Sequence, residues 1–209
     1  SIISVELTPA HAKAYNTLLQ RERKKVLRLL DDMDVDGNRM TVFRSLTLLR
    51  MMALDPAIVE GGSYSSIESS KMQTLLESLG RVIDEGHRVI VFSQFTSFLQ
   101  RISDELTSRG AAHLYLDGSV PMSERADLVT AFQEGSAPVF LISLKAGGAG
   151  LTLTAADYVF IMDPWWNPAA EAQAVDRAHR IGQDKKVMVY RLVAQGTIEE
   201  KAVSYTHLR

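Results

Sequence analysis

From residue 71 onward, short apolar runs alternate with amphipathic segments of about a dozen residues, and this alternation restricts the possible folds more than any other feature. The apolar runs cover residues 88–93, 112–118, 138–144, 157–163 and 187–196. Predicted helices fill the segments between them, at 71–86, 95–110, 123–135 and 168–182. Strands that alternate with helices form parallel sheets covered on both faces. The sequence therefore predicts an α/β fold.

The first 70 residues show helical spacing without this alternation. The pattern predicts, in order, a helix at 8–30, an acidic loop at 31–38, a second helix at 39–56 and a Gly- and Ser-rich linker at 60–70. We therefore divide the chain into a mainly helical segment with its linker (1–66), an α/β domain (67–203) and a tail (204–209).

Composition narrows the function classes. Of the 209 residues, 46% are hydrophobic and 23% are charged, and the net charge of −2 argues against a uniformly basic nucleic-acid binder while leaving room for a local basic groove. There is no cysteine, which excludes disulfides and Cys-ligated metals. No apolar run approaches the roughly 20 residues of a membrane span, and the N-terminus does not resemble a signal peptide. We expect a soluble intracellular domain cut from a longer protein.

In parallel sheets the functional loops lie beyond the carboxyl ends of the strands. The first such loop follows VIVFSQF (89–95), where Ser93 and Gln94 end a strand and open a helix. Free backbone N–H groups at a helix start favour an anion. A plain N-cap serine is the alternative interpretation.

The second loop lies in SLKAGGAGLTLTAA (143–156). Its small residues Gly147, Gly148, Ala149 and Gly150 let the backbone approach a ligand closely, and Ser143 and Lys145 are placed to meet a phosphate. The glycine spacing fits neither a P-loop nor a dinucleotide fingerprint. A structural Gly-rich turn is the alternative.

The third feature is the predicted helix at 168–182. Gln173, Arg177 and Arg180 fall within about a 60° arc of it, and two guanidinium groups on one face suit a terminal phosphate. Asp176 and His179 are placed to orient them. Surface salt bridging is the alternative.

Adjacent tryptophans, Trp165 and Trp166, precede that helix in the sequence DPWWNP. Two neighbouring indoles are difficult to bury together, so one could stack on nucleic acid, although core packing of both is also possible. The five histidines lack metal-ligand spacing, and we predict no metal site within the chain.

The order of these motifs resembles a known family. VIVFSQF, LYLDGS, LISLKAGGAGLTLTAADYVFIMDPWWNP and QAVDRAHRIGQ resemble helicase motifs IV, V and VI of the SWI/SNF-type branch of superfamily-two helicases. The resemblance covers 71–203, and residues 1–60, with LTLLRMMALDP, are similar to the helical segment that joins the two lobes in this family. It implies a RecA-like C-terminal lobe.

Members of this family are DNA-stimulated ATPases that move along double-stranded DNA and remodel DNA–protein complexes. ATP with Mg²⁺ lies between two RecA-like lobes, and the N-terminal lobe of the same polypeptide supplies the P-loop lysine and the acidic box. Neither motif occurs in this chain. The resemblance therefore implies that the chain alone does not hydrolyse ATP. Its expected partners are double-stranded DNA, the N-terminal lobe and DNA-bound proteins. The expected location is the cytoplasmic nucleoid if the source is prokaryotic and the nucleus if it is eukaryotic. The compact lobe is more similar to the prokaryotic members of the family.

The resemblance also implies roles for single residues. Arg177 and Arg180 correspond to the catalytic arginine fingers. The implied nucleotide contacts are Gly148, Gly150, Gln173 and Asp176, and the implied DNA contacts are Ser93, Gln94, Ser143, Lys145, Thr152 and Trp166. Thr152 stands where motif V usually has asparagine, and SYTHLR (204–209) departs from the charged helix that normally follows GTIEEK, as a non-native tail would.

Two other functions fit parts of the pattern. A nucleic-acid or protein-binding module could keep the fold without ATPase coupling, although such a module has no phosphate for the two arginines to meet. A lobe of a DEAD-box-like RNA helicase would share the architecture, but the WNP box and the RIGQ ending favour duplex DNA.

Overall fold

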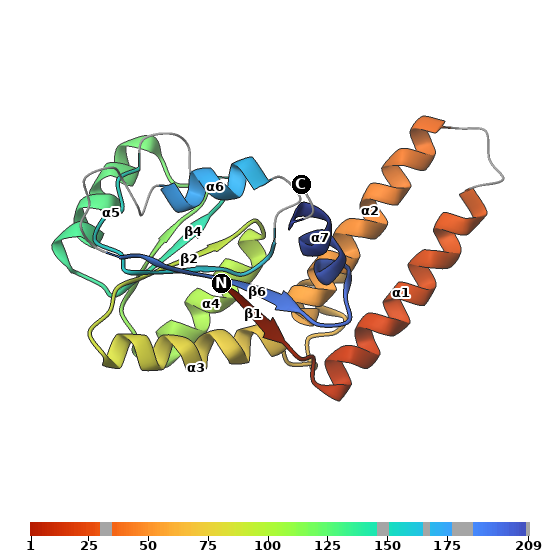
Figure 1. Cartoon of the computed structure of the whole chain (residues 1–209), viewed down its shortest axis with the longest axis horizontal. Coiled ribbons are helices and arrows are strands. Elements are labelled where there is room, and N and C mark those ends of the chain that lie inside the picture. The colour runs from red at the N-terminus through yellow and green to blue at the C-terminus, as the bar shows by residue number, and fades with distance from the viewer. Residues whose placement is uncertain (30–34, 146–150, 165–167, 177–185, 208–209) are drawn as a thin grey trace.

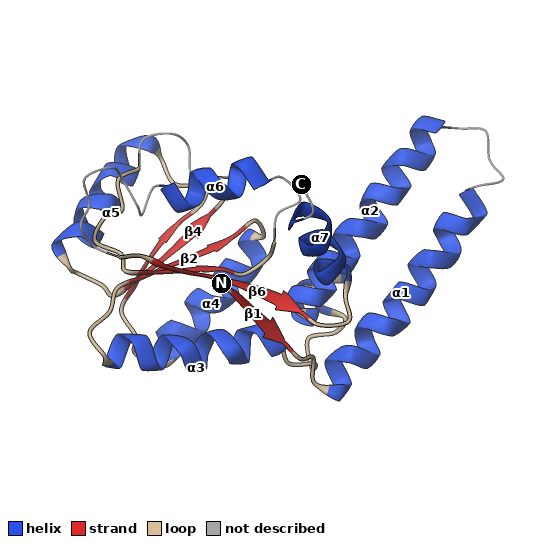
Figure 2. Ribbon diagram, viewed as in Figure 1, coloured by secondary structure: helices blue, strands red, loops and turns tan. Residues whose placement is uncertain are grey.

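The computed structural model describes residues 1–29, 35–145, 151–164, 168–176 and 186–207. Six strands form one sheet in the order β1-β6-β5-β2-β4-β3, and every neighbouring pair is parallel (Figures 1 and 2). The strands are β1 (Ile2–Val5), β2 (Val89–Ser93), β3 (His113–Leu116), β4 (Val139–Ser143), β5 (Tyr158–Ile161) and β6 (Met188–Ala194). The predicted α/β fold is confirmed.

Helices cover both faces of this sheet. The helices that the structure describes are α1 (Pro9–Leu29), α2 (Val35–Leu54), α3 (Ser70–Asp84), α4 (Thr96–Ser108), α5 (Met122–Glu134), α6 (Pro168–Asp176) and α7 (Ile198–His207), with short 3₁₀ turns at Pro56–Ile58 and Glu60–Gly62. Helices α3 and α4 lie on one face, and α5 and α6 lie on the other (Figure 1). None of the helices in the described part of the chain combines the length and apolar character of a membrane span.

The central strands explain why their sequences are continuously apolar. All five residues of β2 and all five of β4 are buried. Within β2, Val89 and Val91 pack with α3 and α4, whereas Ile90 and Phe92 pack with the α5 side. Because successive side chains of a strand point to opposite faces, a strand covered on both faces needs an apolar residue at every position.

Three features of the secondary structure differ from what local spacing predicts. Residues 2–5 form an edge strand paired with β6, so the segment predicted as helical contributes to the sheet of the α/β domain. Helix α2 begins at Val35, inside the predicted loop, and α7 runs to His207, past the predicted start of the tail at residue 204. These boundaries depend on long-range pairing and packing, which local spacing does not reveal.

Helices α1 and α2 form a hairpin that projects from the sheet (Figure 1). Its base is attached to the rest of the molecule by buried polar contacts. His11 is fully buried, with Nε2 donating to the Met52 carbonyl (2.6 Å) and Nδ1 accepting from the Ser70 backbone N–H (3.2 Å). The Tyr15 hydroxyl accepts from the Ile198 N–H (2.9 Å), which joins α1 to α7.

The neutral imidazole is the form that these contacts require. If Nδ1 of His11 carried a proton, it could no longer accept the hydrogen bond from the Ser70 N–H. Burial lowers the pKa of His11, and this outweighs the opposing effects of the Met52 carbonyl and Asp55. The hairpin base is therefore most stable when His11 is uncharged.

We expect the free energy of unfolding to fall as the pH drops below about 6.5, because the unfolded histidine then takes up a proton that the folded one resists. Urea unfolding at about pH 8 and at about pH 6 would measure this loss. A His11→Gln variant should be less stable at high pH but should show a shallower pH dependence. Parallel pH profiles for the two proteins would contradict the assignment.

Candidate site at the carboxyl edge of the sheet

Three motif-bearing strands end side by side. Ser93 at the end of β2 is in register with Ser143 at the end of β4, and Phe92 is in register with Ile161 of β5. The loops that follow these strands therefore begin at one edge of the sheet, as predicted for a ligand site. Residues 93–94, 143–145 and 162–164 line that edge.

Asp163 is the centre of the hydrogen bonds at this edge. Its carboxylate is fully buried and accepts from the Ser93 hydroxyl (2.5 Å) and from the Gln94 N–H (3.1 Å). Burial raises the pKa of Asp163, and the hydrogen bonds and the nearby positive charges of Lys71 and Arg50 oppose that rise. Asp163 thus connects the end of β5 to the start of the loop after β2.

The predicted DNA contact by Ser93 stays a prediction, and the structure gives this side chain a role inside the fold. Ser93 is fully buried, and its hydroxyl donates to Asp163 while accepting from the Phe95 N–H (3.1 Å). Its role is therefore close to the helix-capping alternative, since it orders the first turn before α4.

Two polar atoms at the same edge are buried without a hydrogen-bond partner among the described residues. They are Nε2 of Gln94 and Oγ of Ser143. An unsatisfied buried polar group costs about 1–3 kcal/mol, so such groups are uncommon and call for a physical explanation. Both belong to the predicted DNA-binding set: Gln94 directly follows β2, and Ser143 is the last residue of β4.

Lys71 stabilises this edge of the sheet, and the sequence analysis did not predict this role. The side chain is fully buried, and Nζ donates to the Met162 carbonyl (2.5 Å) and pairs with the Glu199 carboxylate (2.6 Å). Glu199 in turn accepts from the Ala194 N–H (2.9 Å). Burial raises the pKa of Glu199, against the effect of the Lys71 charge. One ammonium group thereby joins α3, the end of β5 and α7.

A sequence signal for this contact did exist. Lys71 lies on the same helical stripe as the buried residues Leu75, Ser78 and Val82, at spacings of four, seven and eleven residues. A lysine on the apolar stripe of a helix requires a buried partner. The sequence does not reveal which carboxylate that is, because Glu199 lies 128 residues further along the chain.

Helix α6 presents part of the predicted nucleotide site. Gln173 and Asp176 are exposed, whereas Val175 packs against the core on the α5 side of the sheet. Lys145 is exposed and Thr152 is half-buried. The other predicted residues, Arg177, Arg180, Gly148, Gly150 and Trp166, lie outside the described residues.

The described residues contain no group of three or more His, Asp or Glu side chains able to hold a metal ion. The expectation that Mg²⁺ is held mainly by another lobe stays untested by this observation.

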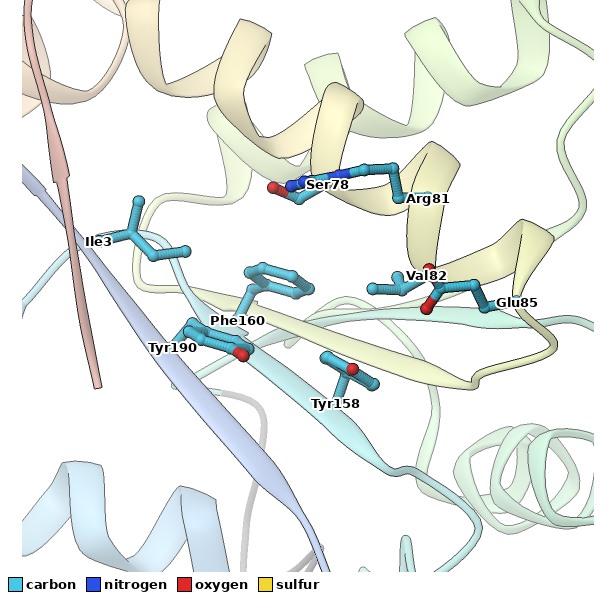
Figure 3. Close-up of a pocket in the computed structure, with 8 residues that line it drawn as sticks. All are labelled: Ile3, Ser78, Arg81, Val82, Glu85, Tyr158, Phe160 and Tyr190. Atoms are coloured by element: carbon cyan, nitrogen blue, oxygen red, sulfur yellow. The ribbon is translucent and has the colours of Figure 1, made fainter.

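A pocket of about 270 Å³ lies near the other end of the sheet (Figure 3). Tyr158, Phe160 and Tyr190 form an aromatic floor, and Arg81 of α3 and Glu85, the residue directly after α3, line its wall. Tyr158 is the first residue of β5, so this pocket is close to the amino ends of the strands. It does not coincide with the candidate site.

The parallel sheet and the motifs gathered at its carboxyl edge define a RecA-like lobe of the helicase type. The chain matches the family described as helicase conserved C-terminal domain over residues 70–182, and it belongs to that family. Within it, the chain is a C-terminal lobe of the SWI/SNF type.

Solved structures and curated relatives agree with this assignment. An ATPase core of the SWI2/SNF2 type from Sulfolobus solfataricus, in complex with double-stranded DNA, is 29% identical with a TM-score of 0.84, covering 100% of this chain and 43% of that one. The C-terminal domain of the Sulfolobus solfataricus SWI2/SNF2 ATPase is 28% identical with a TM-score of 0.80, covering 100% and 84%. Protein CHROMATIN REMODELING 24 of Arabidopsis thaliana is 49% identical over 134 residues, which are 64% of this chain and 12% of that protein. The chain thus spans only about an eighth of that relative.

We expect Lys71→Met to lower the free energy of unfolding by about 3–5 kcal/mol, because it leaves buried carboxylates without their cation. Glu199→Gln should also destabilise the chain, and the double variant should lose less than the sum of the two single losses. Urea unfolding measures all three.

Lys25→Met is the matched control for this cycle. Lys25 forms an ion pair with Glu22 at 3.1 Å but is 51% exposed, so its loss should cost no more than about 1 kcal/mol. Equal losses for the two lysine variants would contradict a central role for Lys71.

Proposed function

We propose that the chain is the C-terminal lobe of an ATP-dependent double-stranded-DNA translocase, and that it supplies arginine fingers and DNA contacts to a composite ATPase site. The observation that carries this proposal is the common carboxyl edge of β2, β4 and β5, at which the chain leaves the sheet toward the sequences of motifs IV, V and VI. The similarity to an ATPase core in complex with double-stranded DNA supports it.

ATP with Mg²⁺ supplies the phosphoanhydride bond whose hydrolysis drives movement. Arg177 and Arg180 stabilise the charge that develops on the transferring phosphoryl group. Gln173 and Asp176 orient the nucleotide from the exposed side of α6, and Gly148 and Gly150 allow the backbone to approach it. The P-loop lysine and the acidic box come from the N-terminal lobe, because GxxxxGK[ST] occurs nowhere in this chain.

We assign the DNA side of the site to residues at and beyond this edge of the sheet. Gln94, Ser143 and Lys145 offer donors where β2 and β4 end, and Thr152 and Trp166 complete the set. The unsatisfied Nε2 of Gln94 and Oγ of Ser143 are the atoms that we assign to phosphate or to a loop reordered by DNA. We assign Ser93 a supporting role through Asp163.

The alternatives lead to different behaviour. A binding module without ATPase coupling would lose DNA affinity, and not turnover, when the arginines are replaced. An RNA helicase lobe would be stimulated by RNA in preference to duplex DNA. The relatives named above favour DNA, since one is a DNA complex and another carries chromatin remodelling in its name. The setting is the nucleus if the source is eukaryotic, as in Arabidopsis thaliana, and the nucleoid if it is prokaryotic.

In the full-length protein, Arg177→Ala and Arg180→Ala should each lower DNA-stimulated kcat by about 10³–10⁵-fold, because a finger acts on the transition-state charge. The affinity for duplex DNA should stay near that of the parent. Steady-state ATP hydrolysis and fluorescence anisotropy measure the two quantities. Arg109→Ala, which removes an exposed cation paired with Glu105, is the control and should leave turnover unchanged.

The chain alone should show no ATP turnover with duplex DNA. Turnover by the chain alone that Arg180→Ala abolishes would refute the two-lobe site. Retained turnover with lost DNA affinity in the arginine variants would instead favour the binding module.

Gln94→Ala and Ser143→Ala should leave the thermal stability unchanged or slightly higher, because each removes a buried polar atom that has no partner among the described residues. Both should nevertheless lower DNA-stimulated turnover in the full-length protein. Thermal unfolding and ATPase titrations with duplex DNA separate these effects. A large drop in melting temperature with unchanged turnover would show that the two groups serve only the fold.

A further inference from the structure

The side of α1 that faces away from α2 carries a regular stripe of exposed side chains. Its members recur at spacings of four, three, four and four residues, which places them within about an 80° arc of the helix. They are Lys13, Thr17, Gln20, Lys24 and Arg28, and all are exposed. We name these five residues the α1 stripe.

The positive charge of the α1 stripe is not neutralised within the described part of the molecule. Helix α1 contains six cations, Lys13, Arg21, Arg23, Lys24, Lys25 and Arg28, and one anion, Glu22. Glu22 is buried on the opposite side, where it pairs with Lys25 and Arg21 and accepts from Ser45. Lys13, Lys24 and Arg28 form no ion pair with any described residue.

The local charge contrasts with the whole chain. Six cations and one anion give α1 a charge of +5, while the chain carries −2 in total, so the remaining residues carry −7. Aspartates 31, 32 and 34 follow α1 in the sequence and lie outside the described residues. Helix α1 is therefore strongly cationic within a chain that is acidic elsewhere.

The first half of α1, where the stripe begins, is anchored in the core. His11, Ala14, Tyr15 and Leu18 anchor the first half of α1 in the core, through the hydrogen bonds to Met52, Ser70 and Ile198 and through apolar packing. The hairpin projects clear of the sheet (Figure 1). A pre-ordered array loses little backbone entropy on binding, which favours affinity.

We propose that the α1 stripe is a second surface for duplex DNA, separate from the interlobe site, which binds the phosphate backbone without reading bases. Lys and Arg together with Thr and Gln are the side chains that contact phosphates and sugars. From Lys13 to Arg28 the stripe extends about 22 Å, which is longer than the roughly 12 Å width of a major groove. It can therefore reach phosphates on both sides of one groove.

An acidic protein helix is a poorer fit to this surface. Such a partner normally docks through apolar anchors in a groove, and the five residues of the stripe include none. Leu27, which is 52% exposed, borders the stripe without interrupting it. Charge complementarity with a regular polyanion is the feature that the surface offers.

The test uses the full-length protein and two duplexes, one long enough only for the interlobe site and one that extends well beyond it. Affinity is measured by fluorescence anisotropy over a series of salt concentrations. For the long duplex, Lys24→Glu/Arg28→Glu should reduce the slope of log Kobs against log salt by about 1.8, since each phosphate contact contributes about 0.9. For the short duplex, affinity and DNA-stimulated turnover should be those of the parent.

Arg81→Glu/Arg109→Glu is the matched control, because it makes the same charge change at exposed positions on α3 and after α4. It should leave both slopes near the parental values. Equal slopes for the stripe variant and the parent on the long duplex would overturn the proposal, as would equal losses on both duplexes. The binding measurement does not depend on ATP hydrolysis, so a protein without turnover would reject the proposed ATPase and still test the stripe.

Discussion

The arrangement of this lobe depends on the contacts of one buried ammonium group, that of Lys71. Lys71 reaches the Met162 carbonyl and the Glu199 carboxylate at once. Because a buried ion without partners is strongly unfavourable, α3, the end of β5 and the start of α7 reach their native positions together or not at all. The residue after Met162 is Asp163, which receives Ser93 and the loop after β2. The Lys71 contacts therefore help to position the edge of the sheet that carries the motifs.

Buried polar contacts also attach the α1–α2 hairpin to the rest of the molecule. Buried polar groups at its base, above all the neutral His11 between Met52 and Ser70, have partners only when α1, α2 and α3 are packed together. Asp55, buried after α2, caps the following turn and pairs with Arg101 of α4 at 2.5 Å. These contacts make the hairpin and the sheet one unit. The DNA surface proposed at the sheet edge and the one proposed on α1 would therefore keep a constant separation and orientation.

Much of this architecture could be predicted, and the failures have a common cause. The five strands and four of the five described helices from residue 70 onward follow from periodicity, because a strand buried on both faces and an amphipathic helix leave distinct patterns. Strand β1 was missed as part of the sheet, because four residues paired with β6 almost 190 positions away leave no local signal of their partner. The hydrogen bond from Ser93 to Asp163 was not predicted for the same reason, since Asp163 is distant in the chain.

Periodicity and the order of the motifs were sufficient for the fold class and the family, because both are written in the spacing of neighbouring residues. Only the tertiary structure shows which buried polar groups form hydrogen bonds or ion pairs with one another. Lys71 with Glu199, Ser93 with Asp163 and His11 with Met52 are pairs separated by 41 or more positions, and each compensates for desolvation that only a closed core imposes. The unsatisfied Gln94 and Ser143 likewise became visible only when neighbouring strands had been paired.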